Sequence, residues 1–73
     1  MARIVKRYLV GISYKDGSAD NDLIQGFSAA CEKAEKASLS ADVIESSVWR
    51  NWTPIRDYKE GIVVKEHNGT QAY

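Results

Sequence analysis

The 73-residue sequence predicts a small α+β domain, with one amphipathic helix packed on a three- to four-stranded, mostly antiparallel sheet in β-α-β-β order. Two observations lead to this fold class. One stretch repeats its apolar residues at helical spacing, and other stretches alternate or concentrate them as strands do. The length leaves room for a single domain over residues 1–73, and the 44% apolar content is typical of a folded chain.

The first predicted strand covers residues 4–15, where large apolar and smaller or polar side chains alternate. One face would carry Tyr8, Val10, Ile12 and Tyr14, and we expect this aromatic and β-branched face to meet the helix. The Asp-Gly-Ser sequence that follows is typical of a turn.

The predicted helix runs from about Asp20 to Leu39. At about 100° per residue its apolar side chains gather on one arc, with most of the charged ones outside it. The arc comprises Leu23, Ile24, Phe27, Ala30, Cys31, Ala34 and Ala37. We expect Leu23, Phe27, Cys31 and Ala34 to lie side by side against the sheet, with Cys31 acting as a small buried hydrophobe.

A second interpretation gives the order ββαββ. It places a strand at residues 22–27, paired with the first strand through the loop of residues 16–21, and begins the helix at Ser28. The unbroken apolar arc from Leu23 favours the longer helix. Gly26 favours the strand, because glycine is a poor residue for a helix interior.

Two further strands are predicted after the helix, at residues 42–50 and 62–66. Residues 51–60 contain the only proline of the chain and are interpreted as a loop. Residues 68–73 carry an Asn-Gly hairpin signal and the stub of a fourth strand. A strand, a helix and a second strand in this order favour a right-handed crossover.

The most unusual segment spans residues 49–59, where both tryptophans occur with two arginines and a tyrosine. These residue types dominate protein-binding hot spots, because they bring large contact area and polar reach. Loops on a rigid sheet are a common location for them. The candidate partner-binding residues are Trp49, Arg50, Trp52, Arg56, Tyr58 and Lys59. We expect one tryptophan to lie in the core and the other to be partly exposed.

The same segment allows a second function, that of a small nucleic-acid-binding regulator. Its aromatic rings would stack on bases, and nearby cations would bind phosphates. The cations are Arg50, Arg56 and Lys59, joined by Arg3, Lys6 and Arg7 from the other end of the chain. Ten basic and ten acidic side chains cancel, however, which weighs against this function.

The sequence carries no motif for catalysis, a cofactor or a metal. His67, the only histidine, has no cysteine or second histidine nearby. Alternate residues from Asp16 to Asp22 resemble the start of a calcium loop, but Asn21 and Phe27 stand where glycine and glutamate are required. We therefore expect no catalytic residue, no cofactor and no metal site.

These observations predict a non-enzymatic protein-binding module, an inhibitor or adaptor that docks on a larger protein through a sheet edge or the aromatic segment. In size and layout the chain resembles small phage-encoded inhibitors, which act by covering a host protein. A homodimer is a further expectation, because small domains gain core by associating. A single cysteine and the absence of a signal or membrane-spanning pattern favour the cytoplasm and no membrane partner.

Overall fold

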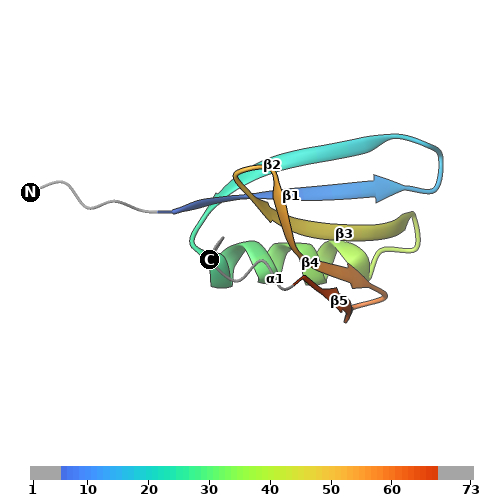
Figure 1. The fold of residues 1–73 in the computed structure, drawn as a ribbon. Coiled ribbons are helices and arrows are strands. Elements are labelled where there is room, and N and C mark those ends of the chain that lie inside the picture. Colours follow the sequence, from blue (N-terminus) through green and yellow to red (C-terminus); the bar gives the residue numbers. More distant parts are fainter. Residues whose placement is uncertain (1–5, 68–73) are drawn as a thin grey trace, which may run out of the picture.

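The computed structural model describes residues 6–67, which form one helix packed on a five-stranded antiparallel sheet (Figure 1). The elements in chain order are β1 (Arg7–Tyr14), β2 (Ala19–Gln25), α1 (Phe27–Ser38), β3 (Val43–Arg50), β4 (Thr53–Lys59) and β5 (Ile62–Glu66). The strands lie in the order β2-β1-β3-β4-β5, and each neighbouring pair is antiparallel. The predicted two-layer α+β class is confirmed. The number of strands and their order differ from the prediction.

The first difference lies before the helix, where residues 19–25 form a strand. β2 pairs with β1 from Arg7 opposite Gln25 to Ser13 opposite Ala19. Gly26 follows with φ of +91°, a conformation that a helix cannot contain, and α1 begins at Phe27. A helix starting near Asp20 was therefore wrong. The alternative was right to place a strand paired with β1 before the helix, but it set this strand at residues 22–27 and the helix start at Ser28, and its order ββαββ lacks one strand after the helix. The helix connects β2 to β3, which run parallel to each other on either side of β1.

The second difference is β4, which occupies most of the predicted loop. Two-residue turns, Asn51-Trp52 and Glu60-Gly61, flank this strand, and all four residues have positive φ as a type I′ hairpin requires. Pro54 is tolerated because it is the second residue of the strand. It lies opposite Trp49 next to a register shift, beyond the stretch of β4 that pairs with β5.

The core lies between α1 and the sheet face that carries Tyr8, Val10 and Ile12, as predicted. Ala30 and Ala34 are completely buried, and their small side chains let the helix approach the strands closely. The buried apolar residues are Tyr8, Val10, Ile12, Ala30, Ala34, Val43, Val48, Ile55 and Tyr58. The Ser46 hydroxyl, buried among them, donates a hydrogen bond to the Ala34 carbonyl.

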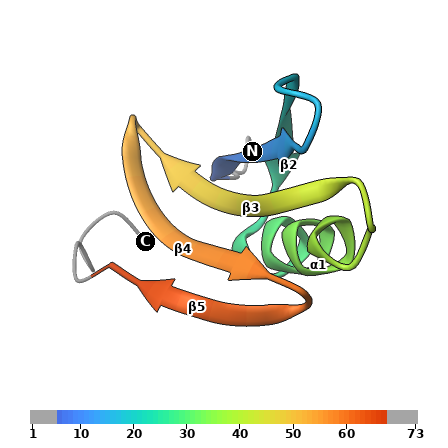
Figure 2. The same ribbon diagram turned by 90° about the vertical axis from the view of Figure 1, so that its right-hand side faces the viewer.

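Of the four helix residues expected against the sheet, Ala34 is buried and Phe27 and Cys31 are partly buried against the core. Leu23 is the exception, because it belongs to β2 and is 66% exposed. Figure 2 shows that the sheet bends between β3 and β4, so that β4 and β5 come round toward α1.

Among the described residues no helix is long and apolar enough to cross a membrane. The predicted hairpin and strand stub of residues 68–73, and the candidate cation Arg3, lie outside the described residues.

Candidate protein-binding surface

The predicted binding residues divide between the two faces of the sheet. Residues directly opposite each other on antiparallel strands share a face. Trp49 lies opposite Leu9 and Pro54 on the face that α1 leaves uncovered, which we call the open face. Arg56 lies opposite Val48, on the face that α1 covers. The segment is therefore a strand end, a turn and a second strand, and it does not form a single recognition loop.

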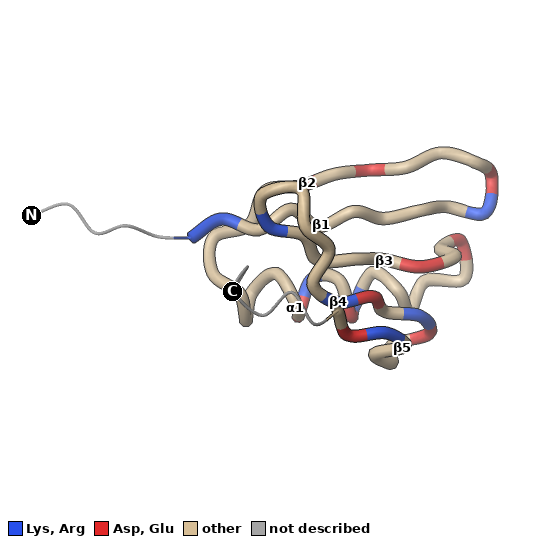
Figure 3. The backbone as a smooth tube through the Cα atoms, in the orientation of Figure 1, with Lys and Arg blue, Asp and Glu red and all other residues tan. Residues whose placement is uncertain are grey.

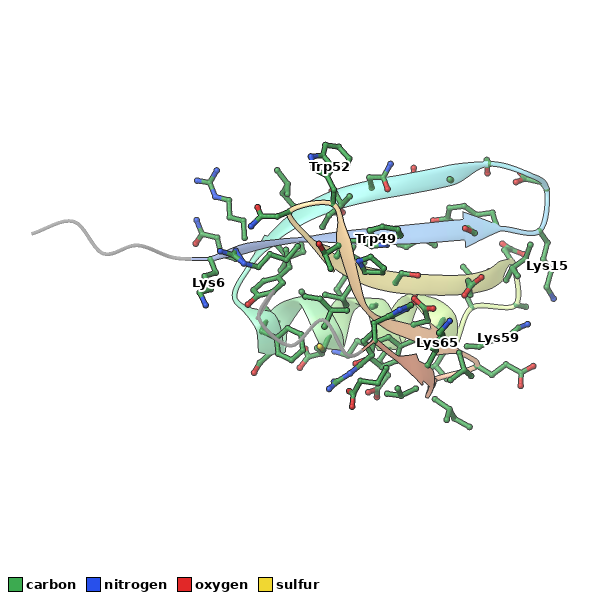
Figure 4. All side chains as sticks on the ribbon, in the orientation of Figure 1. Lys6, Lys15, Trp49, Trp52, Lys59 and Lys65 are labelled. Carbon is green, nitrogen blue, oxygen red and sulfur yellow. The ribbon has the colours of Figure 1, made fainter. Side chains whose placement is uncertain are left out.

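Trp52 is the most exposed large apolar side chain among residues 6–67, at 88% of its full exposure. It is the second residue of the β3–β4 turn and has φ of +64°. In Figure 2 this turn stands clear of the sheet on the side away from α1, and in Figure 4 the indole extends past β2. A side chain with a Cβ in this conformation costs about 1–2 kcal/mol, and glycine is the preferred residue there.

Trp49 is half-buried on the open face. Its Nε1 lies 3.9 Å from the position that a Cβ on Gly11 would occupy, so the missing side chain of Gly11 leaves room for the indole. Neither tryptophan lies in the core, which corrects the expectation that one of them would. The core positions are filled by tyrosine and β-branched side chains instead.

Two leucines extend the apolar surface around the indoles. Leu9 lies opposite Trp49 on β3 and opposite Leu23 on β2. We define the open-face patch as Leu9, Leu23, Trp49 and Trp52, which line one shallow depression together with Arg7 and Asn51. Neither leucine was among the predicted binding residues. The sequence signal that could have indicated this patch was Leu9, a large apolar residue on the face of β1 opposite to the core face of Tyr8.

A second shallow hollow, of about 450 Å³, lies on the open face next to the indoles. Small residues of the three neighbouring strands line it, among them Gly11, Ser13, Ala19 and Ser47. Because these side chains are short, the sheet surface is low there, while Trp49 and Trp52 rise beside it. The open face thus combines a projecting indole with a recess.

Arg56 and Tyr58 are engaged within the fold and do not belong to this surface. Arg56 Nε donates to Glu66 Oε1 at 2.6 Å, and its guanidinium lies 5.3 Å from the centre of the Phe27 ring. Arg56 Nη1 also contacts the Tyr58 hydroxyl at 3.4 Å and the Cys31 sulfur at 3.6 Å. The hydrogen bonds to Tyr58 and Glu66 raise the pKa of Arg56. Burial raises the pKa of the Tyr58 phenol, which is 2% exposed.

The other two predicted residues are also separated from the patch. The guanidinium of Arg50 lies over the Tyr8 ring, 5.6 Å from its centre. Lys59 is exposed at the far end of β4, at a distance along the sheet from Trp52 (Figure 4). Of the six predicted residues, only Trp49 and Trp52 lie together on the open face.

The two ends of the sheet differ in charge. Arg7, the first residue of β1, lies beside the patch, whereas Asp16, Asp20 and Asp42 line one depression with Tyr14 at the other end of the sheet, the end at which Figure 3 shows several acidic segments. Lys15 is the cation among these acids. The Tyr14 hydroxyl donates to Asp20 at 3.0 Å, and this bond raises the pKa of Tyr14. Charge is thus distributed unevenly along the strand direction, although the net charge of the chain is zero.

Comparisons of this chain with protein-family models, curated proteins and solved structures give no match. Within residues 6–67 no cluster of three or more histidine, cysteine, aspartate or glutamate side chains is placed to hold a metal ion.

Proposed function

We propose that this chain is a protein-binding module whose partner docks on the open-face patch. The observation that carries the proposal is Trp52, an almost fully exposed indole on a turn residue with positive φ. In the free chain this side chain adds backbone strain and buries little surface. Burial of a large apolar side chain against a partner contributes about 2–3 kcal/mol, and strained residues concentrate at functional sites.

The surroundings of Trp52 have the composition of a protein-binding surface. Leu9, Leu23 and Trp49 form an apolar centre beside the indole. Short polar residues such as Ser13 and Asn21 lie at its border. An apolar centre, a polar rim and aromatic anchors are the features that specific interfaces share. A module of this kind acts as an inhibitor or adaptor by covering part of its partner.

Protein is favoured over nucleic acid because two of the expected phosphate-binding cations, Arg50 and Arg56, are engaged within the fold. Arg56 is paired with Glu66, and Arg50 lies over the Tyr8 ring. The hollow beside the indoles is also lined by the acidic Glu45. Strong single-strand binding needs a positively charged groove alongside its aromatic platform.

The proposal is tested by affinity capture from the native cell with the wild-type chain and with Trp52→Ala. We expect the substitution to weaken capture by at least about 30-fold, the effect of losing a hot-spot side chain. Ile62→Ala is the matched control, because Ile62 is a comparably exposed apolar residue on β5.

Circular dichroism of each variant checks that the fold is intact. Nuclease treatment of the lysate should leave capture unchanged. Undiminished capture by Trp52→Ala would contradict the proposed surface, and loss of the captured material on nuclease treatment would favour the nucleic-acid function.

A further inference from the structure

We infer that the partner of the open face is a second copy of this chain, docked face to face about a two-fold axis that crosses the strands. This inference rests on the proposed function and names the partner for the same surface. Shape, charge and the extent of the uncovered face each support it.

The shape of the open face is self-complementary. Trp52 projects from it, and the hollow over Gly11, Ser13 and Ser47 lies beside the indole, toward the β1–β2 turn. A two-fold axis across the strands reverses their direction, so the turn end of one copy covers the patch end of the other. Each Trp52 then enters the hollow of the opposite copy, and both contacts form at once, as in any isologous interface.

The charges agree with the same arrangement. On the open face, Arg7 lies at the patch end of β1, and Glu45, opposite Ser13, lies toward the other end. Reversal of the strand direction places Arg7 of one copy toward Glu45 of the other. Opposite charges therefore meet at both ends of the interface. With ten positive and ten negative side chains, the two copies have no net repulsion to overcome.

The extent of the uncovered face sets the expected affinity. The region formed by β2, β1 and β3 is three strands wide and eight residues long at most. With standard strand spacing its flat footprint is about 400 Å² per copy. The two copies together would bury about 800 Å² before side-chain relief is added, which is the size of weak, transient interfaces, so we expect a dissociation constant no tighter than the micromolar range.

The sheet has two edge strands, β2 and β5, and edge pairing through the apolar β5 is one competing route to a dimer. Ile62, Val63 and Val64 are exposed on this edge strand. The strand is only five residues long, carries Lys65, and has a register shift in its pairing with β4. Short length, lysine and bulges are the features by which edge strands avoid pairing, so the open face is the better candidate.

Sedimentation equilibrium from about 5 μM to 1 mM tests the inference with four chains: wild type, Trp52→Ala, Ser13→Arg and Val64→Lys. Wild type should be dimeric at the upper concentrations. Trp52→Ala removes the projecting group and Ser13→Arg fills the hollow, so each should weaken dimerisation at least tenfold. Val64→Lys on β5 should leave it unchanged, and raising the salt from 50 to 500 mM should weaken it several-fold.

A monomeric wild type at 1 mM, or a dimer that only Val64→Lys disrupts, would overturn the inference. Ser13→Arg and Val64→Lys both retain Trp52, so they keep the test valid if Trp52→Ala folds poorly.

Photo-crosslinking separates this inference from the proposed function. A chain with a photoreactive phenylalanine derivative at position 52 is irradiated in the native lysate. Only a crosslink that doubles the mass of the chain and joins position 52 to a peptide of the other copy that contains Gly11, Ser13 or Ser47 supports the second copy, because Trp52 also borders this hollow in its own chain. A crosslink only to another protein leaves the proposed function standing and overturns the second copy. A crosslink only to nucleic acid, or none together with a monomeric chain, overturns both.

Discussion

Trp52 shows how one residue can oppose the stability of its own turn. Its φ of +64° belongs to the second position of a type I′ turn, for which Asn-Gly is the preferred sequence. The chain has the asparagine, Asn51, but carries the largest side chain where glycine fits best. The indole is also too exposed to repay this strain by packing within the free chain.

We predict that Trp52→Gly stabilises the free chain by about 1 kcal/mol, because glycine adopts positive φ without a steric cost. For a domain of this size the gain corresponds to a rise in unfolding temperature of about 4–8 °C, measurable by circular dichroism. Asn51→Gly is the matched control and should change stability less, because asparagine already tolerates this conformation. A lower unfolding temperature for Trp52→Gly would mean that the indole packs on its own fold.

The candidate binding residues illustrate what residue type alone can predict. The density of Trp, Arg and Tyr in residues 49–59 singled out both tryptophans, which the structure places beside one hollow on the open face. It also grouped them with Arg56 and Tyr58, which face α1. Side chains of a strand alternate between its two faces. Arg56 and Tyr58 could therefore be separated from the tryptophans only by predicting β4 as a strand, and the sequence prediction placed a loop there. Leu9 and Leu23 join the patch only through strand pairing, which the local sequence does not specify.

At the scale of elements, Ser38 connects the end of α1 to the β4–β5 turn. Its hydroxyl accepts the Gly61 N–H at 2.8 Å and donates to the Glu35 carbonyl at 2.7 Å. The residue is almost completely buried, so water cannot replace these bonds.

We predict that Ser38→Ala lowers the free energy of unfolding by about 1–2 kcal/mol, because it leaves the Gly61 N–H without its partner. Urea denaturation gives the stability, and hydrogen exchange of the Gly61 amide, which should become faster, locates the effect. Ser40→Ala is the control, since Ser40 is exposed and its hydroxyl makes only a 3.4 Å contact with the Asp42 N–H. Equal losses in both variants would show that the buried connection has no special role.

The elements that were predicted correctly are those whose local pattern and tertiary environment agree. The alternation of β1 matches its buried face, and the apolar residues of α1 from Phe27 onward match the core. Only Ile24 of β2 is partly buried, so this strand shows almost no alternation of apolar and polar residues. In addition, Leu23 and Ile24 lie at helical spacing from the apolar residues of α1, which made a longer helix look continuous. The decisive local signal was Gly26, which terminates the strand.

β4 was missed because Pro54 outweighed the evidence on either side of it. The Glu60-Gly61 pair before an apolar run was a hairpin signal, and it implied a strand ending near Lys59. Pro54 is compatible with this strand only because it lies near the strand start, outside the stretch from Arg56 to Lys59 that pairs with β5. That position depends on the sheet order, a tertiary fact that the local sequence does not contain.

In the whole molecule, one face of the sheet is covered by α1 and the other carries both tryptophans. The helix-side face holds the stabilising contacts and the open face the candidate binding contacts. Substitutions on the two faces should therefore separate stability from binding. Tyr58 lies on the face that α1 covers, next to Arg56 and the helix residue Cys31.

Stability of the whole fold should consequently depend on the protonation of Tyr58. Burial raises the pKa of this phenol above its ordinary value of 10.0, so the folded state keeps the proton at a pH where the unfolded chain releases it. This contribution is fully present below about pH 10 and is lost as the pH rises through the raised pKa. We expect urea midpoints to fall above pH 10 in the wild type and to fall less in Tyr58→Phe. Tyr14→Phe is the control: the pKa of Tyr14 is also raised, by Asp20, but the hydroxyl contact is exposed and weakly coupled to folding. An equal alkaline decline in all three chains would assign the transition to groups other than Tyr58.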